Sequence, residues 1–204
     1  TGDTGFVRLI LGDSYVNMTL ENIEQGDPLA VYKKMNGVDM FMGITFNNIR
    51  VSFLTFIAGL FFSIGTILLL LYNGIMLGTF HHFFYTHSLL LKSLSVIWIH
   101  GTLEISSIII AGAAGLILGN SILFPKTYSR RQSFLIASKD GIKIIVGLIP
   151  LFIIAGFLES FVTRFTEMPI LINILIIAGS LFFIIWYVIF YPIKLKKRED
   201  NDTK

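Results

Sequence analysis

Residues 94–118 read LSVIWIHGTLEISSIIIAGAAGLIL, an apolar stretch that contains two ionisable side chains, His100 and Glu104. A helix rises about 1.5 Å per residue, so a helix over this stretch can cross the hydrocarbon core of a bilayer, which is about 30 Å thick. The rest of the chain is similar: 54% of its 204 residues are hydrophobic and 14% are charged, with a mean hydropathy of +0.76. Soluble domains carry about 25% charged residues. The composition therefore predicts an integral membrane protein and argues against a soluble enzyme.

Three further apolar stretches are long enough to span a bilayer, and they cover residues 51–72, 142–161 and 170–193. Together with residues 94–118 they predict an all-α, polytopic transmembrane bundle of about four spanning helices. A shorter apolar piece, residues 74–85, contains His81 and His82. Its length is more typical of a short re-entrant or interfacial segment than of a span.

The distribution of Lys and Arg predicts how these helices are oriented, because basic residues near helix ends are retained in the cytoplasm. With four crossings and a first helix that starts inside, the cytoplasmic side receives Lys33, Lys34, Arg50, Lys126, Arg130, Arg131, Lys139, Lys143, Lys194, Lys196, Lys197 and Arg198. The outer side receives Lys92 and Arg164. A fifth crossing at residues 74–85 would spread the basic residues over both faces. We therefore predict four crossings, with both termini in the cytoplasm.

These helices divide the chain into three parts. Residues 1–50 are expected to form a cytoplasmic or interfacial segment with short amphipathic helices, residues 51–193 the transmembrane domain, and residues 194–204 a disordered basic cytoplasmic tail. Within the first part, Asp27 and Pro28 predict the start of a short helix. We expect that helix to end near Gly37. Residues 38–49 then form either a helix on the membrane surface that turns into the first span or the frayed start of a helix continuous with that span.

His100 and Glu104 lie four residues apart, which places them on one face of a helix. Helical spacing adds small residues to the same face, namely Ser107, Ala111, Ala114 and Gly115. The opposite face carries bulky apolar side chains: Trp98, Ile105, Ile109 and Leu116. An ionised carboxylate is costly in hydrocarbon. We therefore predict that the face with His100 and Glu104 points into the protein.

The His100 and Glu104 pair has three interpretations. We favour an internal hydrogen-bonded pair that fixes helix packing, since polar contacts between membrane helices are common. The second is a proton or substrate route, which intramembrane carboxylates often mark. The third is metal ligation, for which a further ligand is needed. The other histidines, His81, His82 and His87, could supply it, although no spacing signature indicates a site.

Neither a metal nor a cofactor is predicted, and no catalytic residue is assigned. The sequence contains no phosphate-binding glycine-rich loop, nucleophile elbow or paired-histidine metalloprotease motif. It also contains no cysteine, which rules out disulfides and zinc–thiolate sites. The sequence therefore predicts a protein that is not an enzyme.

Small residues at four-residue spacing predict close helix packing, because lipid removes the usual hydrophobic drive for helix association. Two such patterns occur, Ala111-x3-Gly115-x3-Gly119 and Gly74-x3-Gly78. Protein partners or a second copy of the chain are compatible with either pattern.

Two charge patterns predict contacts at the membrane boundary. Glu159 and Arg164 bracket the outer end of the third predicted span, and we expect them to form an interfacial ion pair. The chain has a formal charge of +3, and its basic residues flank apolar runs. The bilayer, with its anionic lipids, is therefore a better partner than nucleic acid.

Five sequence blocks carry a family resemblance: residues 47–51 (NNIRV), the glycines from Gly59 to Gly65-Thr66, residues 73–78 (NGIMLG), residues 100–104 (HGTLE) and residues 110–115 (IAGAAG). Their order over about residues 15–192 resembles the stage II sporulation protein M family of bacterial membrane proteins. The resemblance implies a multi-pass scaffold of the bacterial cytoplasmic membrane that recruits or anchors partner proteins such as peptidoglycan hydrolases. The alternative is a transporter or permease subunit with a polar route at His100 and Glu104, gated by residues 74–85.

Overall fold

The computed structural model describes residues 4–34 and 36–202, and the regular elements in this part of the chain are all helical. The longer helices are α1 (Thr4–Leu11), α2 (Asp13–Glu24), α4 (Gly37–Ile57), α5 (Ile64–Thr86), α6 (Leu90–Leu123), α7 (Arg130–Phe157), α8 (Ile170–Ile185) and α9 (Tyr191–Asp202). Shorter elements are α3 (Val31–Lys34), the 3-10 turn η1 (Ala58–Leu60), and the π-helical turns η2 (Leu158–Val162) and η3 (Trp186–Phe190).

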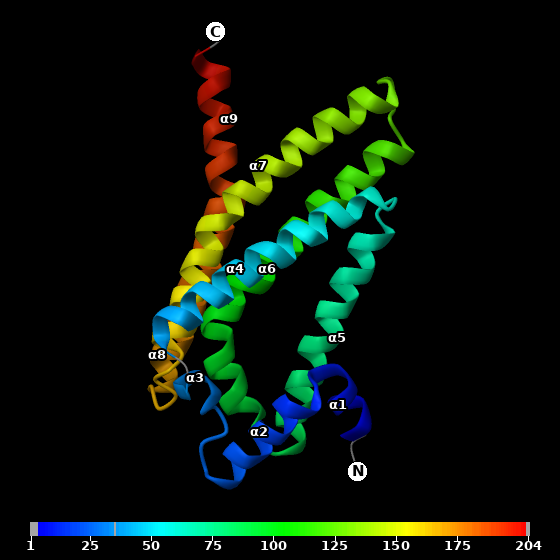
Figure 1. Cartoon of the computed structure of the whole chain (residues 1–204). Coiled ribbons are helices and arrows are strands. Elements are labelled where there is room, and N and C mark those ends of the chain that lie inside the picture. The colour runs from blue at the N-terminus through cyan, green and yellow to red at the C-terminus, as the bar shows by residue number, and fades with distance from the viewer. Residues whose placement is uncertain (1–3, 35, 203–204) are drawn as a thin grey trace.

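Five segments of the described chain are long and apolar enough to cross a membrane: Gly37–Leu60, Ile64–Thr86, Leu90–Leu123, Arg130–Val162 and Ile170–Arg198. They run alternately in opposite directions (Figure 1). The predicted class, an all-α multi-pass membrane bundle, is therefore confirmed. The number of candidate spans is five, not four.

The additional helix comes from a reversal of the chain inside the predicted span 51–72. Helix α4 ends, η1 follows, and α5 starts in a new direction at Ile64. The reversal uses positive φ angles of 53° at Phe62 and 67° at Ser63. Phe61 and Phe62 are large apolar residues, so hydropathy gives no sign of a turn here. Residues 74–85, predicted as a re-entrant segment, are the second half of continuous α5.

Several predicted boundaries also differ from the structure. Gly37 does not end a helix but begins α4, where the Asn36 side chain accepts a hydrogen bond from the backbone N–H of Val38 at 2.9 Å. The predicted domain boundary at residue 50 therefore lies inside α4. The tail expected to be disordered is helical in α9 as far as Asp202.

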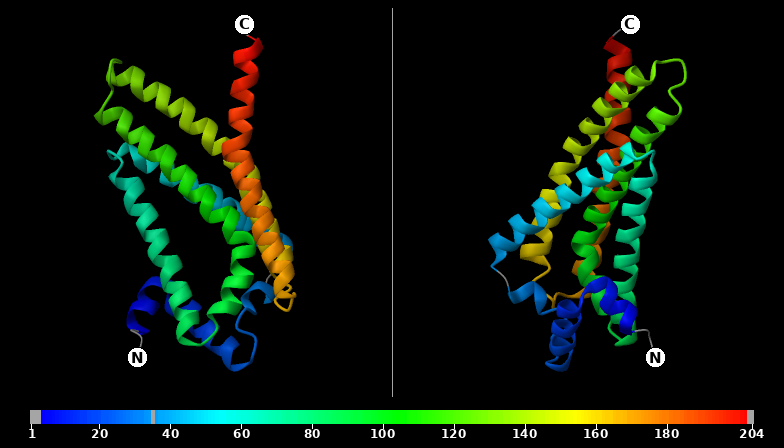
Figure 2. Two further views of the ribbon diagram at one scale, coloured as in Figure 1. Left: turned by 180° about the vertical axis from the view of Figure 1, so that it is seen from behind. Right: turned by 45° about the vertical axis from the view of Figure 1, so that its right-hand side comes forward.

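The two described ends of the chain lie at opposite ends of the bundle. Helices α1 and α2 sit beside the end of α5, whereas α9 projects from the other end (Figures 1 and 2). The Arg164 side chain donates hydrogen bonds to the carbonyls of Tyr32 at 2.9 Å and Lys33 at 3.2 Å. Lys33 and Arg164, predicted on opposite faces of the membrane, are therefore at the same end. The two described ends therefore do not lie at the same end of the bundle, as a pair of cytoplasmic termini would require.

Helix α6 is the centre of the bundle, with α4, α5, α7 and α8 packed around it. The face predicted to point inward is buried, and Ser107, Ala111 and Ala114 are at most 1% exposed. On the opposite face, Ile109 is 58% exposed. Helical periodicity therefore predicted the correct inward face.

The two small-residue patterns have different surroundings. A Cβ atom added at Gly115 would lie 2.6 Å from Oγ1 of Thr66 and 2.8 Å from the carbonyl oxygen of Thr55, and one added at Gly119 would meet the backbone of Gly59 and Ser63. Ala111, in the same pattern, is fully buried. A Cβ atom at Gly74 or Gly78 would meet none of the described residues within 4 Å. The α6 pattern thus packs against the α4–α5 reversal, and the α5 pattern faces open space.

Candidate functional site

His100 lies in the buried part of α6 and is 4% exposed. Its Nδ1 atom lies 3.1 Å from Oγ1 of Thr163, and Oγ1 of Thr163 also donates a hydrogen bond to the carbonyl of Leu158 at 3.1 Å. The ring of Tyr32 lies over the histidine, with 6.0 Å between ring centroids. The imidazole is therefore held from two sides, by Thr163 at the end of η2 and by Tyr32 of α3.

Glu159 reaches the same histidine from η2. The backbone N–H of Thr163 bonds to the carbonyl of Leu158 at 2.8 Å, which is the i to i+5 bond of a π turn. Such turns are rare and are frequently found at functional sites. Oε1 of Glu159 lies 3.8 Å from Nε2 of His100, and the Glu159 side chain is 16% exposed.

Glu104 completes a cluster of three ionisable side chains. One ligand-type atom from each of His100, Glu104 and Glu159 lies within 4.8 Å of the others. The sequence placed His100 and Glu104 on one helical face, and the structure brings both together with a carboxylate from a distant part of the chain. Glu159 was identified from the sequence as a boundary residue, but no local spacing links it to α6.

The predicted pair of Glu159 and Arg164 has other partners in the structure. Glu159 faces His100, while Arg164 binds the backbone carbonyls of Tyr32 and Lys33. A charged side chain that binds carbonyls between helices stabilises their relative position. Arg164 therefore fastens α3 to the connection between α7 and α8.

Tyr32 stands outside the spanning helices and is buried against the cluster. Burial raises the pKa of the Tyr32 phenol well above its ordinary value of 10, and the negative charges of Glu159 and Glu104 act in the same direction. The phenol is therefore neutral at physiological pH and retains its O–H as a hydrogen-bond donor.

A cavity of about 290 Å³ between α4, α5 and α6 reaches Glu104. Apolar surface makes up most of its lining, and the polar residues that line it besides Glu104 are Asn47, Asn48, Thr55, Tyr72 and Asn73. The side chain of Asn48 is buried and lies next to the Glu104 carboxyl group. Glu104 therefore connects the buried cluster with a space that polar groups line.

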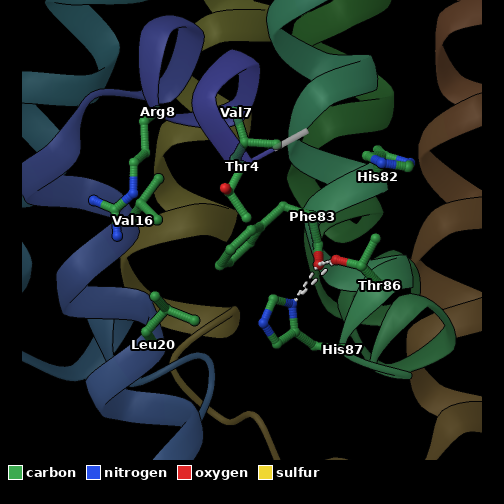
Figure 3. Close-up of a pocket in the computed structure, with 9 residues that line it drawn as sticks. All are labelled: Thr4, Val7, Arg8, Val16, Leu20, His82, Phe83, Thr86 and His87. Atoms are coloured by element: carbon green, nitrogen blue, oxygen red, sulfur yellow. Dashed lines mark hydrogen bonds between the residues drawn. The ribbon is translucent and has the colours of Figure 1, made fainter. Parts of the chain in front are cut away.

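The remaining histidines do not join this cluster. His81 stacks on Trp98, with ring centroids 6.3 Å apart. His82 and His87 line a separate cavity of about 220 Å³ between α1, α2 and α5, together with Val7, Arg8, Val16, Leu20 and Phe83 (Figure 3). There, Nδ1 of His87 lies 2.8 Å from the carbonyl oxygen of Phe83. None of these three histidines belongs to the cluster at His100, in which Glu159 is the third ionisable side chain.

The fold and the buried polar cluster define a multi-pass, helical membrane protein with ionisable groups between its helices. The family model for stage II sporulation protein M matches residues 7–164, and the chain belongs to that family. The resemblance seen in the sequence blocks is thus confirmed. The matched region contains His100, Glu104 and Glu159 and ends before α8. No curated protein and no solved structure matches the chain.

Proposed function

We propose that this protein is a membrane scaffold that anchors partner proteins, such as peptidoglycan hydrolases, at the bacterial cytoplasmic membrane. Family membership supports the proposal. The observation that carries it is the layer formed by α1, α2 and α3, which is fixed to one end of the bundle and lies outside the spanning helices (Figure 1). No catalytic step is assigned to the protein.

The layer of α1, α2 and α3 is attached through a buried apolar cluster. Leu29 and Phe84 are 1% exposed, and Val16 and Val96 pack in the same cluster. Such a core holds the layer in one position relative to the membrane. A fixed platform can present partners at a defined height and orientation, which a flexible tether cannot.

The outer surface of this layer exposes large apolar side chains. Phe6 is 47% exposed and Leu9 is 80% exposed, both on α1. Exposed apolar side chains close together favour contact with another protein or with the membrane surface. We assign the partner contact to this face of α1.

The distribution of basic residues supports an outer position for the layer. The end of the bundle near α9 receives Arg50, Lys126, Arg130, Arg131, Lys139, Lys143, Lys194, Lys196, Lys197 and Arg198, whereas the end near α1 receives Arg8, Lys33, Lys34, Lys92 and Arg164. By the positive-inside rule the first end is cytoplasmic. The α1 layer then lies on the outer face, where peptidoglycan is located.

Because the chain contains no cysteine, single cysteines can test this orientation without background labelling. We expect Leu9→Cys to react with a membrane-impermeant maleimide in intact cells or spheroplasts. Lys197→Cys should react only after the membrane is permeabilised. The reverse labelling pattern would place the layer in the cytoplasm and exclude an extracellular hydrolase as its partner.

Crosslinking tests the scaffold itself. A photoreactive phenylalanine analogue at Leu9 should form a protein adduct in the native membrane, and mass spectrometry should identify a peptidoglycan hydrolase or another envelope protein. The same analogue at Phe182, an α8 residue that is 71% exposed, is the matched control and should crosslink to lipid. Identical adducts at both positions, or no adduct at Leu9, would contradict the assignment of the partner contact to this face of α1.

A transporter or permease subunit is the second candidate function. The cavity beside Glu104, which Asn47, Asn48 and Asn73 help to line, is the observation that favours it. The chain reconstituted in proteoliposomes would then carry protons or a small cation, and Glu104→Gln would abolish that flux. If tight vesicles show no flux of protons, sodium or potassium, a transport function for those ions is excluded.

A further inference from the structure

We propose that His100, Glu104 and Glu159 form a binding site for one divalent transition-metal ion, with Zn²⁺ as the best-fitting ion. The three side chains come from the middle of α6 and from η2 and lie within reach of a single ion. The site is independent of the scaffold proposal, since it lies inside the bundle and the assigned partner surface lies on α1.

The distances fit an ion after small movements of the side chains. Zinc binds histidine nitrogen and carboxylate oxygen at about 2.0–2.2 Å, so ligand atoms around a tetrahedral ion are about 3.4 Å apart. Nε2 of His100 and Oε1 of Glu159 are 3.8 Å apart, and the three groups are within 4.8 Å. Binding of an ion therefore requires rotation about the side-chain bonds of the two glutamates to close these gaps.

The hydrogen bonds around His100 set the tautomer that metal binding requires. Thr163 has one hydroxyl proton, and its donation to the carbonyl of Leu158 leaves its oxygen as an acceptor. Nδ1 of His100, 3.1 Å away, is then the donor, so Nε2 carries a lone pair. This lone pair faces Glu159 across 3.8 Å, too far for a hydrogen bond. Metal-binding histidines usually donate their second N–H in this way.

Charge balance favours a divalent ion. Metal ligation requires both carboxylates in the ionised form, which with a neutral imidazole gives a total charge of −2 that is costly inside a membrane unless a cation balances it. Two basic side chains at this end of the bundle bind elsewhere: Arg164 donates hydrogen bonds to two backbone carbonyls, and Lys92 lies 3.5 Å from Glu167. A divalent cation brings the charge of the cluster to zero.

The ligand set also selects the kind of ion. Calcium and magnesium prefer sets of six or more oxygen ligands. One imidazole and two carboxylates suit zinc, and three protein ligands leave a fourth position open for water or a partner group. The cavity between α4, α5 and α6 borders the site at Glu104.

The test uses the chain purified in detergent, stripped of metal with a chelator, and titrated with Zn²⁺ against a chromophoric competitor. We expect one ion per chain, confirmed by elemental analysis. His100→Ala and Glu159→Gln should abolish this binding. Thr163→Val, which removes only the group that orients the imidazole, should weaken it by about 10–100-fold. His82→Ala is the matched control and should bind as the unmodified chain does.

A cobalt titration adds a signature of the ligands. Bound Co²⁺ should give the visible absorption of a nitrogen and oxygen site with four or five ligands, and Thr163→Val should change its intensity. Circular dichroism of each variant reports whether the helices are intact. A folded chain that binds no zinc would overturn the proposal. Binding that persists in both His100→Ala and Glu159→Gln would also overturn it, because the ion would then be adventitious.

Discussion

Helices α5 and α6 are neighbours in the chain and both are strongly apolar, but they occupy different environments. Seventeen of the 34 residues of α6 are buried, compared with four of the 23 residues of α5. Both helices carry glycines at four-residue spacing. In α6 these glycines allow the α4–α5 reversal to approach the helix backbone, whereas a Cβ atom added at Gly74 or Gly78 in α5 would have none of the described residues within 4 Å. A small-residue pattern thus indicates the capacity for close packing, and the neighbouring helix determines whether that capacity is used.

Replacement of a glycine by a large residue should give the largest difference in stability between variants of the two helices. Gly115→Leu should strongly destabilise the bundle, because its Cβ atom alone would lie 2.6 Å from Oγ1 of Thr66. Overpacking a tight core costs about 1–3 kcal/mol, or more where backbone must move. Gly78→Leu should leave the free energy of unfolding almost unchanged or raise it. Denaturation in detergent, followed by circular dichroism, measures both variants, and equal losses would contradict the comparison.

Loss of the link between the layer of α1, α2 and α3 and the bundle should have the next largest effect on stability. Arg164→Gln removes two charge-assisted hydrogen bonds to the carbonyls of Tyr32 and Lys33. Each bond to a charged group contributes about 1.5–3 kcal/mol when buried, and partial exposure of Arg164 reduces this value. Hydrogen exchange should increase over residues 31–34, while exchange in α6 stays slow. Uniform loosening of α6 as well would show that the layer and the bundle unfold together.

Removal of a buried hydroxyl on α5 should have a smaller effect on the free energy of unfolding. Oγ1 of Thr66 donates to the carbonyl of Thr55 at 2.7 Å, which joins α5 to α4. Thr66→Val should lower the free energy of unfolding by about 1 kcal/mol. The matched variant Thr79→Val removes a bond to Ile75 within α5 itself and should have a smaller effect. The same denaturation experiment measures both free energies of unfolding. A larger loss for Thr79→Val than for Thr66→Val would contradict the conclusion that the Thr66 hydroxyl joins α5 to α4.

The sequence predicted the class of the fold and the inward face of α6, because both depend on properties of single helices. Hydropathy reports whether a segment suits lipid, and periodicity reports which face is polar. The reversal at Phe62 and Ser63 was missed, because the run around it is apolar and neither of its positive φ angles falls on a glycine. The meeting of Glu159 with His100 was missed because packing between helices brings distant residues together.

The smallest expected effect tests the lipid-facing side of α6. Ile109 is 58% exposed on the face opposite to His100, so Ile109→Leu should change the free energy of unfolding by less than about 0.5 kcal/mol. Ile108, one residue earlier and 9% exposed, packs in the core with Leu103 and Phe152. Ile108→Ala should therefore cost about 2–5 kcal/mol, as other large-to-small core changes do. If Ile109→Leu proved as harmful as Ile108→Ala, α6 would have to be rotated about its axis, and His100 and Glu104 would then face lipid.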